Sequence, residues 1–459
     1  MRLEIEPSLA QQINEGAENL VSILQTAPEN PTDVSEAFRP NHPQPTASLV
    51  DPEIPRGPLQ FTIGTSGAEA DRFFPDLSPP VGFFDDGHVN FINLCQRIQQ
   101  IDALNPYVSL TYVVEVMFEW VKLRHLKATD QPLMDYLLLR CMRSITRQEI
   151  LLPIVGIDVE HEIDIGKVVI KKLRQPTWQG WMTEWIMRRP AEVANVKKFL
   201  TDINADQVVV ASQLVTAEPI RAVEIALTWT QSALEILSYF APSNFHPAMP
   251  IICAVSGSEF VERPRHMIIR DRVLISAGVT TVNLRSRHPW TIKATTLDKM
   301  KGKGFDTLVR LINEKEENLT EFQRDILRAI SIFSRSSRAQ NLTDKLLYAV
   351  LALESILLKD QSESLQKHIG ERMAFLIGQT VEARRDIISS YKVAYGLRSG
   401  AVHHGRLVTD EETLGVFLPN TWHTLNKLIT EADRFLTKQD MIMFVDEIKF
   451  IPFEGDAAS

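Results

Sequence analysis

The spacing of apolar residues divides the chain into a mixed first part and a purely helical last part. Apolar residues at helical spacing predict helices over 7–25, 88–104, 108–127, 131–146 and 218–240. β-Branched and alternating runs predict a hairpin around Gly166 and strands near 208–210, 249–254, 266–277 and 280–284. The middle of the chain is therefore expected to be α+β with a small sheet.

Beyond about residue 305 the sequence shows no further strand-like pattern, and the remaining segments are all predicted to be helical. The helical segments are separated by expected gaps near 315–319, 337–341, 360–363, 378–381 and 404–420, and a last helix is expected over 421–438. Thr320 and Gln323 fit a capping box at the start of one helix. Because short gaps imply antiparallel neighbours, this region is predicted to be an up-and-down helical bundle.

The segment from residue 28 to about 82 is rich in proline, serine and acidic residues. Such a composition buries too little apolar surface to offset the entropy lost on ordering. We therefore expect an α+β, mainly α protein in three parts. These are a largely irregular N-terminal segment at 1–86, an α+β accessory or sensor domain at 87–305, and a helical bundle at 306–459.

Composition narrows the setting in which the chain acts. A net charge of -9 argues against a general nucleic-acid coat, although it leaves room for a local basic site. The three cysteines show no metal-binding spacing, which favours a reducing compartment without disulfides. Because the chain shows neither a signal-peptide layout nor a membrane-length apolar run, we expect a cytoplasmic protein with no membrane partner.

Three helices of the predicted bundle each carry a charged residue on an apolar stripe. Glu354 follows Leu347 and Leu351, Arg372 follows Leu365 and Ile369, and Arg398 follows Tyr391 and Ala394. A lone buried charge costs several kcal/mol, so these groups must pair or reach a wet cleft. Glu354 could pair with Arg372 or with Arg398, and the alternative to a functional role is a buried salt bridge that fixes helix register.

The third stripe runs into a segment with catalytic residue types, Arg398-Ser399-Gly400-Ala401-Val402-His403-His404-Gly405. Histidine moves protons near neutral pH, arginine holds a phosphate bidentately, and Ser399 can donate a further hydrogen bond. On a continuous helix Arg398 and His403 would lie about 140° apart. A helix break at Gly400, or a second copy of the chain, would bring them together. The alternative is that these cations only complement the helix dipole.

Three ordered elements of the bundle resemble the Apea-like branch of the HEPN superfamily. They are a helix with the motif Ala-Leu-Glu at 352–354, a helix with the motif Arg-x-Ala-x-Leu at 372–376, and an Arg-Ser-x-x-Val-His element from Arg398 to His403. The resemblance covers roughly residues 320–440, about a quarter of the chain. Their order and separation are more specific than any one element.

The resemblance implies a dimeric helical bundle and, in many members, metal-independent endoribonuclease activity in toxins or antiviral effectors. Arg398 matches the family arginine, Ser399 its polar follower and His403 its histidine. His404 stands where glycine is more usual, so both histidines remain candidates for the active one. Glu354 and Arg372 are expected to orient the site. The expected partners are RNA, a second copy and an antitoxin or trigger, with no metal and no cofactor; the alternative is a non-catalytic nucleotide-binding, RNA-binding or dimerisation scaffold.

Two further patterns bear on RNA binding. A basic strip in 263–303 suggests contact with an RNA backbone, or alternatively a solvated sheet edge, through Arg285, Arg287, Lys299, Lys301 and Lys303. The tryptophans Trp178, Trp181 and Trp185 could stack on bases, although an aromatic core stripe is favoured.

An acidic run around His161 is a weak metal site, because alternate strand residues face opposite ways.

Overall fold

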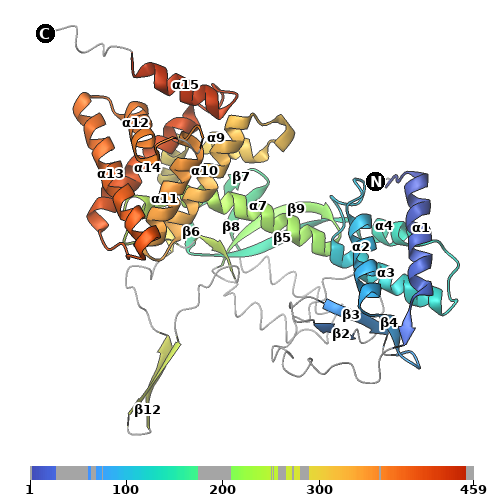
Figure 1. Cartoon of the computed structure of the whole chain (residues 1–459). Coiled ribbons are helices and arrows are strands. Elements are labelled where there is room, and N and C mark those ends of the chain that lie inside the picture. The colour runs from blue at the N-terminus through green and yellow to red at the C-terminus, as the bar shows by residue number, and fades with distance from the viewer. Residues whose placement is uncertain are drawn as a thin grey trace. The chain divides into compact units, whose positions relative to one another are not determined.

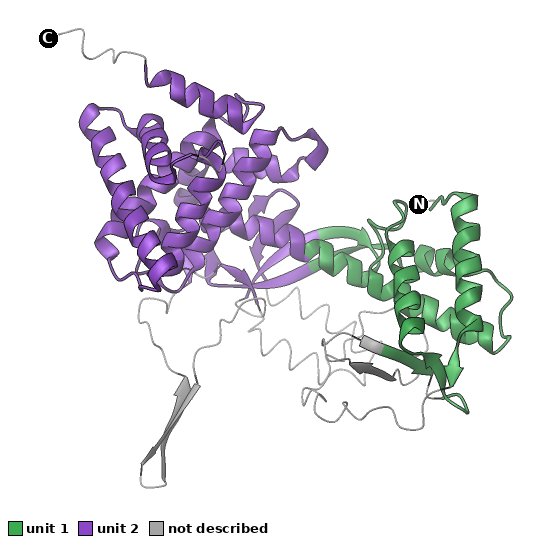
Figure 2. Cartoon of the chain, viewed as in Figure 1, with its two compact units in different colours: residues 1–150, 180–202, 214–226 green, residues 151–179, 203–213, 227–459 purple. Residues whose placement is uncertain are grey.

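The computed structural model describes residues 3–26, 60–63, 69–74, 76–173, 208–249, 251, 253–256, 265–270, 273–279, 289–360 and 363–450 (Figure 1). They fall into two compact units (Figure 2). Unit 1 comprises residues 1–150, 180–202 and 214–226, and unit 2 comprises residues 151–179, 203–213 and 227–459. These ranges do not follow the boundaries expected at residues 86 and 305, because the middle of the chain contributes to both units. The predicted class, α+β and mainly helical, is confirmed.

Unit 1 contains the first four predicted helices. They are α1 (Pro7–Ser22), α2 (Asp86–Gln99), α3 (Leu110–His125) and α4 (Leu133–Ser144). Each contributes fully buried side chains to one hydrophobic core, among them Ile13, Phe91, Tyr112, Trp120 and Leu137. The Ser109 hydroxyl accepts the N–H of Tyr112 and caps α3.

A four-stranded antiparallel sheet lies in the segment that was expected to be irregular. Its order is β1-β4-β3-β2, built from β1 (Gln25–Thr26), β2 (Gln60–Ile63), β3 (Glu69–Phe74) and β4 (Val81–Phe83). The expectation for residues 1–86 was therefore wrong for these strands. Phe74 stacks on Phe118 at 4.0 Å between ring centroids, and Phe83 stacks on Phe91 at 4.8 Å. This aromatic burial offsets the ordering entropy that the proline content suggested would dominate.

The middle of the chain forms a five-stranded sheet of order β10-β5-β9-β8-β7. Its strands are β5 (Thr146–Val155), β7 (Ile163–Ile165), β8 (Val168–Lys172), β9 (Val209–Ala217) and β10 (Ala254–Val255). The predicted hairpin is confirmed as β7–β8, and its turn contains Gly166 at φ +67°, which glycine adopts without strain. Strand β5 was not predicted, because polar residues begin it and Pro153 lies near its end.

Two smaller strand pairs accompany this sheet. β6 (Ile157–Val159) pairs in parallel with β13 (Trp290–Ile292). β11 (Arg265–Arg270) and β12 (Val273–Val279) form an antiparallel hairpin where one long strand was expected over 266–277. The strand expected at 280–284 lies outside the described residues.

The long helix predicted over 218–240 is α7 (Pro219–Tyr239), followed by the 3-10 helix η2 (Pro242–Asn244). The buried Glu218 carboxylate precedes α7 and accepts the N–H groups of Ile220, Arg221 and Ser109 at 2.9, 2.8 and 3.0 Å. A carboxylate in this position satisfies helix N–H groups that have no partner within the helix.

The last part of unit 2 is a helical bundle. It consists of α8 (Ala294–Lys301), α9 (Phe305–Asn313), η4 (Glu316–Asn318), α10 (Glu321–Arg338), α11 (Leu342–Leu357), α12 (Leu365–Ile377), α13 (Val381–His404), α14 (Glu411–Thr430) and α15 (Lys438–Ile448). Helix α11 packs against α10, α12, α13, α14 and α15. It therefore supplies the centre of the bundle core, with Leu346, Ala349, Leu353 and Ile356 fully buried.

Local signals set several helix starts in the bundle. The predicted capping box is present, because Thr320 Oγ1 accepts the N–H of Gln323 at 3.2 Å and Gln323 Oε1 accepts the N–H of Thr320 at 3.1 Å. The side-chain oxygens of Asn341 and Thr380 cap α11 and α13 by accepting the N–H groups of Asp344 and Ala383. The residue types at these positions therefore predict where these helices begin.

The end of the bundle differs from the prediction. The gap expected at 404–420 is only the segment 405–410, and α14 runs through Pro419. The single helix expected over 421–438 is replaced by the last part of α14 and by α15. Phe417, Leu418 and Trp422 are buried in the core. Their packing outweighs the intrinsic helix-breaking tendency of proline.

Arg372 of α12 is the centre of a buried ionic network. Its side chain is 1% exposed and donates to both oxygens of Glu363 at 2.7 and 2.8 Å, to Asp446 at 3.0 Å and to the Leu357 carbonyl at 2.7 Å. The hydrogen bond from Arg372 lowers the pKa of Glu363. The pairing of Glu354 with Arg372 that the sequence allowed does not occur, because these two carboxylates occupy the guanidinium. One arginine thus ties the end of α11, the start of α12 and α15 together.

Replacing Arg372 with alanine should lower the free energy of unfolding by about 3–5 kcal/mol, because two carboxylates and a helix-end carbonyl lose a buried partner. Urea unfolding followed by circular dichroism measures this loss. The matched control is Arg310→Ala, since Arg310 is half exposed and pairs with the exposed Asp433 at 2.7 Å; it should cost less than about 1 kcal/mol. Equal losses in the two variants would contradict the central role of Arg372.

Lys345 of α11 is a buried amine without a carboxylate partner among its hydrogen bonds. Its Nζ donates to the carbonyls of Ser336 and Ser337 at the end of α10, at 3.1 and 3.3 Å. Burial lowers the pKa of Lys345 to about 8 from 10.5. Between these values the unfolded chain holds more protons than the folded one, so the contribution of this group to stability rises with pH.

The stability difference between wild type and Lys345→Met should therefore shift with pH in favour of wild type. The expected slope is at most about 1.4 kcal/mol per pH unit across this window, because a folded neutral amine is compared with an unfolded charged one. Urea unfolding at a series of pH values measures it, and other titrating groups cancel in the comparison. Parallel pH profiles for the two proteins would show that Lys345 does not titrate differently on folding.

Candidate functional site

Helix α13, which carries the predicted catalytic residues, is unbroken from Val381 to His404. It ends at Gly405, whose φ of +61° suits glycine, and the N–H of Gly405 donates to the Ala401 carbonyl at 3.1 Å. Of the two alternatives that the sequence left open, the helix break at Gly400 does not occur. A glycine within a helix costs only about 1 kcal/mol relative to alanine. This cost is too small to interrupt a helix as long as α13.

The continuous helix separates the two residues that were expected to act together. Arg398 and His403 lie about 140° apart around the axis and about 7.5 Å apart along it. Ser399 and His403, four residues apart, share one face of the helix instead. His404 lies on neither of these faces, at about 120° from Arg398 in the other direction. A single chain therefore presents the arginine and the histidines in different directions.

Arg398 is held by two neighbouring groups. Its Nη2 lies 3.7 Å from Glu354 Oε1 on α11, and its Cζ lies 5.7 Å from the ring centroid of Tyr395. The Arg398 side chain is 23% exposed. Of the two partners that the sequence allowed for Glu354, Arg398 is the one the fold selects. The distance exceeds that of a hydrogen bond, so the pair is an electrostatic contact without a fixed bond.

Glu354 and Tyr391 form a buried polar group beside Arg398. The Glu354 side chain is 14% exposed, Tyr391 is fully buried, and neither Glu354 Oε1 nor the Tyr391 hydroxyl has a hydrogen-bond partner in the described part of the chain. Burial raises the pKa of Glu354, and the charge of Arg398 opposes this rise. Burial also raises the pKa of Tyr391, with a further contribution from the Glu354 charge. We call Glu354, Tyr391 and Arg398 the Glu354 cluster.

The stripe that contains Glu354 lies at the edge of α11 rather than in its core. Leu351, one turn before Glu354, is 47% exposed, whereas the buried face of α11 is formed by other residues such as Leu353. Glu354 therefore lies at the boundary between the buried and the exposed face of α11, and not on its fully buried face. Within the Glu354 cluster, Arg398 is the member with the largest contact with solvent, at 23% exposure.

The remaining predicted site residues have different surroundings. His403 and His404 are exposed, and Ser399 is half-buried. Arg372 belongs to the network with Glu363 and Asp446 and does not join Arg398.

The basic strip is described only in part. Lys299, Lys301 and Lys303 are exposed on and just after α8. On α14, burial lowers the pKa of His423, and the Lys303 charge adds to this effect. Arg285 and Arg287 lie outside the described residues, as do Trp178, Trp181 and Trp185.

No metal site stands out among the residues that the structure describes. None of their His, Cys, Asp and Glu side chains form a group of three or more suited to a metal ion. In the acidic run around His161, Asp158 pairs with Lys172 at 2.7 Å and Glu160 accepts the N–H of Ala294 at 3.2 Å. Of the helices in the described ranges, none has the length and apolar content for crossing a membrane.

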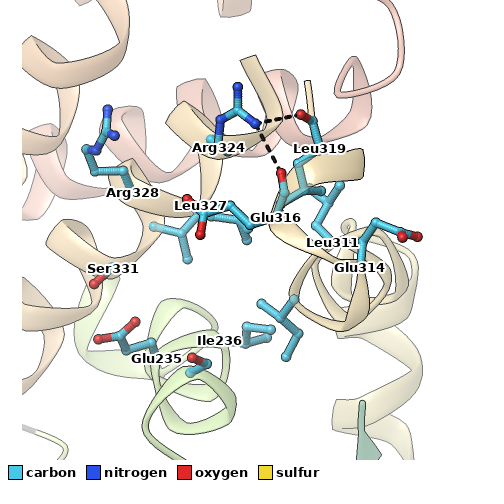
Figure 3. A pocket seen from close by; sticks show the side chains of 13 residues that line it. Glu235, Ile236, Leu311, Glu314, Glu316, Leu319, Arg324, Leu327, Arg328 and Ser331 are labelled. Carbon is cyan, nitrogen blue, oxygen red and sulfur yellow. Dashed lines mark hydrogen bonds between the residues drawn. The ribbon is translucent and has the colours of Figure 1, made fainter. Parts of the chain in front are cut away.

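A pocket of about 340 Å³ opens between α7, α9 and α10, with Glu235, Ile236 and Leu327 among its lining residues (Figure 3). On one side Arg324 donates to the carbonyls of Glu316 and Leu319 at 3.1 and 2.8 Å. None of the predicted site residues that the structure describes lines this pocket. Sequence reasoning missed it because its walls come from separate helices and share no motif.

Comparison with known proteins returned no match to this chain among family models, curated proteins or solved structures. The resemblance to Apea-like HEPN proteins therefore rests on the three ordered sequence elements.

The loose pairing of Glu354 with Arg398 predicts a modest energetic coupling of about 1 kcal/mol between them. Urea unfolding of Glu354→Gln, Arg398→Gln and the double variant gives this coupling as a double-mutant cycle. The matched control is the more exposed pair Lys427 and Glu431, 2.8 Å apart, which should couple by less than about 0.5 kcal/mol. A coupling of zero between Glu354 and Arg398 would show that the contact has no energetic role.

Proposed function

We propose that this chain is a metal-independent endoribonuclease of the HEPN type that acts as a homodimer. The observation that carries the proposal is the geometry of α13. Arg398 and the exposed histidines lie at one end of an unbroken helix but face different directions. A second copy of the same helix can supply the histidine that faces Arg398 across an interface. The active site would then combine Arg398 of one protomer with His403 or His404 of the other.

In this site each group has a defined chemical role. The Arg398 guanidinium holds the scissile phosphate and offsets the charge that builds on its oxygens. The histidine accepts the proton of the 2′-hydroxyl, which attacks phosphorus, and the histidine that is protonated in this step donates the proton to the leaving 5′-oxygen as the P–O5′ bond breaks. Ser399 donates a further hydrogen bond. The nucleophile belongs to the RNA, so cleavage yields a 2′,3′-cyclic phosphate and a free 5′-hydroxyl.

Exposed apolar side chains around Arg398 support the dimer. Helices α11 and α13 are antiparallel, since Glu354 contacts Arg398 and the Thr343 hydroxyl accepts the N–H of Val408 at 2.9 Å. Leu351 shares a face of α11 with Glu354, and Val402 shares a face of α13 with Arg398. They are 47% and 49% exposed. Apolar groups that flank a charged residue in this way suit a self-complementary interface.

The wider role that fits this activity is a toxin or an antiviral-defence effector acting on cytoplasmic RNA. Unit 1 and the five-stranded sheet would then sense a trigger or bind an antitoxin. Exposed Lys299, Lys301 and Lys303, together with Arg285 and Arg287, would guide the RNA backbone by charge.

Mixing two inactive variants tests the composite site. Arg398→Ala and His403→Ala should each reduce cleavage of total cellular RNA by at least about 100-fold. Unfolded together and refolded as a mixture, they should recover at most about half of wild-type activity, because about half of the dimers then combine an intact Arg398 with an intact His403. Gel analysis of the RNA measures the recovery. If the active histidine is His404, the His404→Ala variant replaces His403→Ala in the mixture.

The control is a mixture of Arg398→Ala with Arg398→Gln, which contains no intact site and should remain inactive. Cleavage at the wild-type rate by both Arg398→Ala and His403→Ala would contradict the proposed nuclease activity of this site. Inactive single variants without recovery in the mixture would contradict the division of the site between protomers.

The second candidate is a non-catalytic binding or dimerisation scaffold. It is favoured by the contacts of Arg398 with Glu354 and Tyr395, which could serve structure alone. A dimer in solution, shown by light scattering, combined with no RNA cleavage by wild type would support this candidate.

A further inference from the structure

The Glu354 cluster places a carboxylate in an unusual position. Glu354 Oε1 is buried. Among the described residues, no group hydrogen-bonds to this oxygen, and the nearby opposite charge is the Arg398 guanidinium at 3.7 Å. A carboxylate in such surroundings depends on that positive charge to remain ionised. Movement of Arg398 away from Glu354 therefore favours the protonated form of Glu354.

The other charged groups on helices packed against α11 do not replace Arg398. Arg372 of α12 is saturated by Glu363 and Asp446. Lys438 of α15 donates to the Ser355 carbonyl at 3.4 Å. Lys345, on α11 itself, donates to carbonyls at the end of α10. Tyr391 of α13 is neutral and, if ionised, would add negative charge.

We propose that Arg398 exchanges Glu354 for a phosphate of the RNA and that Glu354 takes up a proton as it does so. This inference rests on the proposed function, because it takes Arg398 to be the phosphate-binding residue. The proton comes from solvent and neutralises the carboxylate, so no buried negative charge is left beside the bound phosphate. Glu354 is thus a positioning residue that aligns Arg398 in the free protein and is neutralised in the complex.

The exchange is supported by the geometry of the pair. A guanidinium 3.7 Å from a carboxylate forms no hydrogen bond, whereas a phosphate offers two oxygens at hydrogen-bond distance. The 23% exposure of Arg398 gives the phosphate access to it. Burial already raises the pKa of Glu354. When Arg398 moves from Glu354 to the phosphate, the negative charge of the phosphate nearby would raise this pKa further.

Binding of a short 2′-O-methyl RNA of random sequence tests the coupling, since this RNA lacks the attacking hydroxyl. Titration calorimetry in buffers of different ionisation enthalpy counts the protons taken up. Wild type should take up more protons than Glu354→Gln, and Glu354→Gln should bind about tenfold more tightly near pH 8, because it loses no charge pair and needs no proton. Histidines at the site contribute equally to both proteins and cancel in the comparison.

The matched control is Glu431→Gln, which makes the same change at a carboxylate paired with Lys427 and should behave as wild type. Equal proton uptake and equal affinity in wild type and Glu354→Gln, with weak binding by Arg398→Gln, would overturn the coupling and leave the nuclease proposal standing. Wild-type-like binding and cleavage by Arg398→Gln would remove the nuclease proposal itself and the coupling with it.

Discussion

The unbroken hydrogen-bond ladder of α13 is the constraint on which the arrangement of the candidate site depends. Because the helix continues past Gly400 and ends only at Gly405, the directions of Arg398 and His403 are fixed by helix geometry. Arg398 turns toward Glu354 of α11, while the histidines are exposed at the helix end. In the homodimer that we propose, the second copy of α13 would supply the histidine that faces Arg398.

Two arginines on apolar stripes have opposite roles in this bundle, and their contacts distinguish them. Arg372 is fully buried and bonds two carboxylates and a carbonyl, so no donor capacity is left for a ligand. Arg398 is partly exposed, has a single carboxylate beyond hydrogen-bond distance and lies over an aromatic ring. Saturation of donors is typical of a structural ion pair, and unsatisfied donors near solvent are typical of a binding residue.

The same contrast explains why Glu354 is important to the chemistry that we propose. A fully bonded carboxylate such as Glu363 has a lowered pKa and remains charged. Burial without hydrogen bonds moves the pKa of Glu354 in the other direction. A carboxylate of this kind can lose its charge when its partner leaves, so the Glu354 cluster can respond to an anion in a way that the Arg372 network cannot.

Sequence by itself determined the elements that depend on neighbours along the chain. The capping box at Thr320 and Gln323, the turn at Gly166 and the helices with strong apolar periodicity follow from local hydrogen bonds and residue conformations. The residue types of the candidate site were also evident. Tertiary structure alone decided that α14 continues through Pro419, that strands form near the proline-rich segment, and which carboxylate faces each arginine. These outcomes depend on the burial of side chains distant in sequence, whose packing energy exceeds local preference and leaves no local pattern.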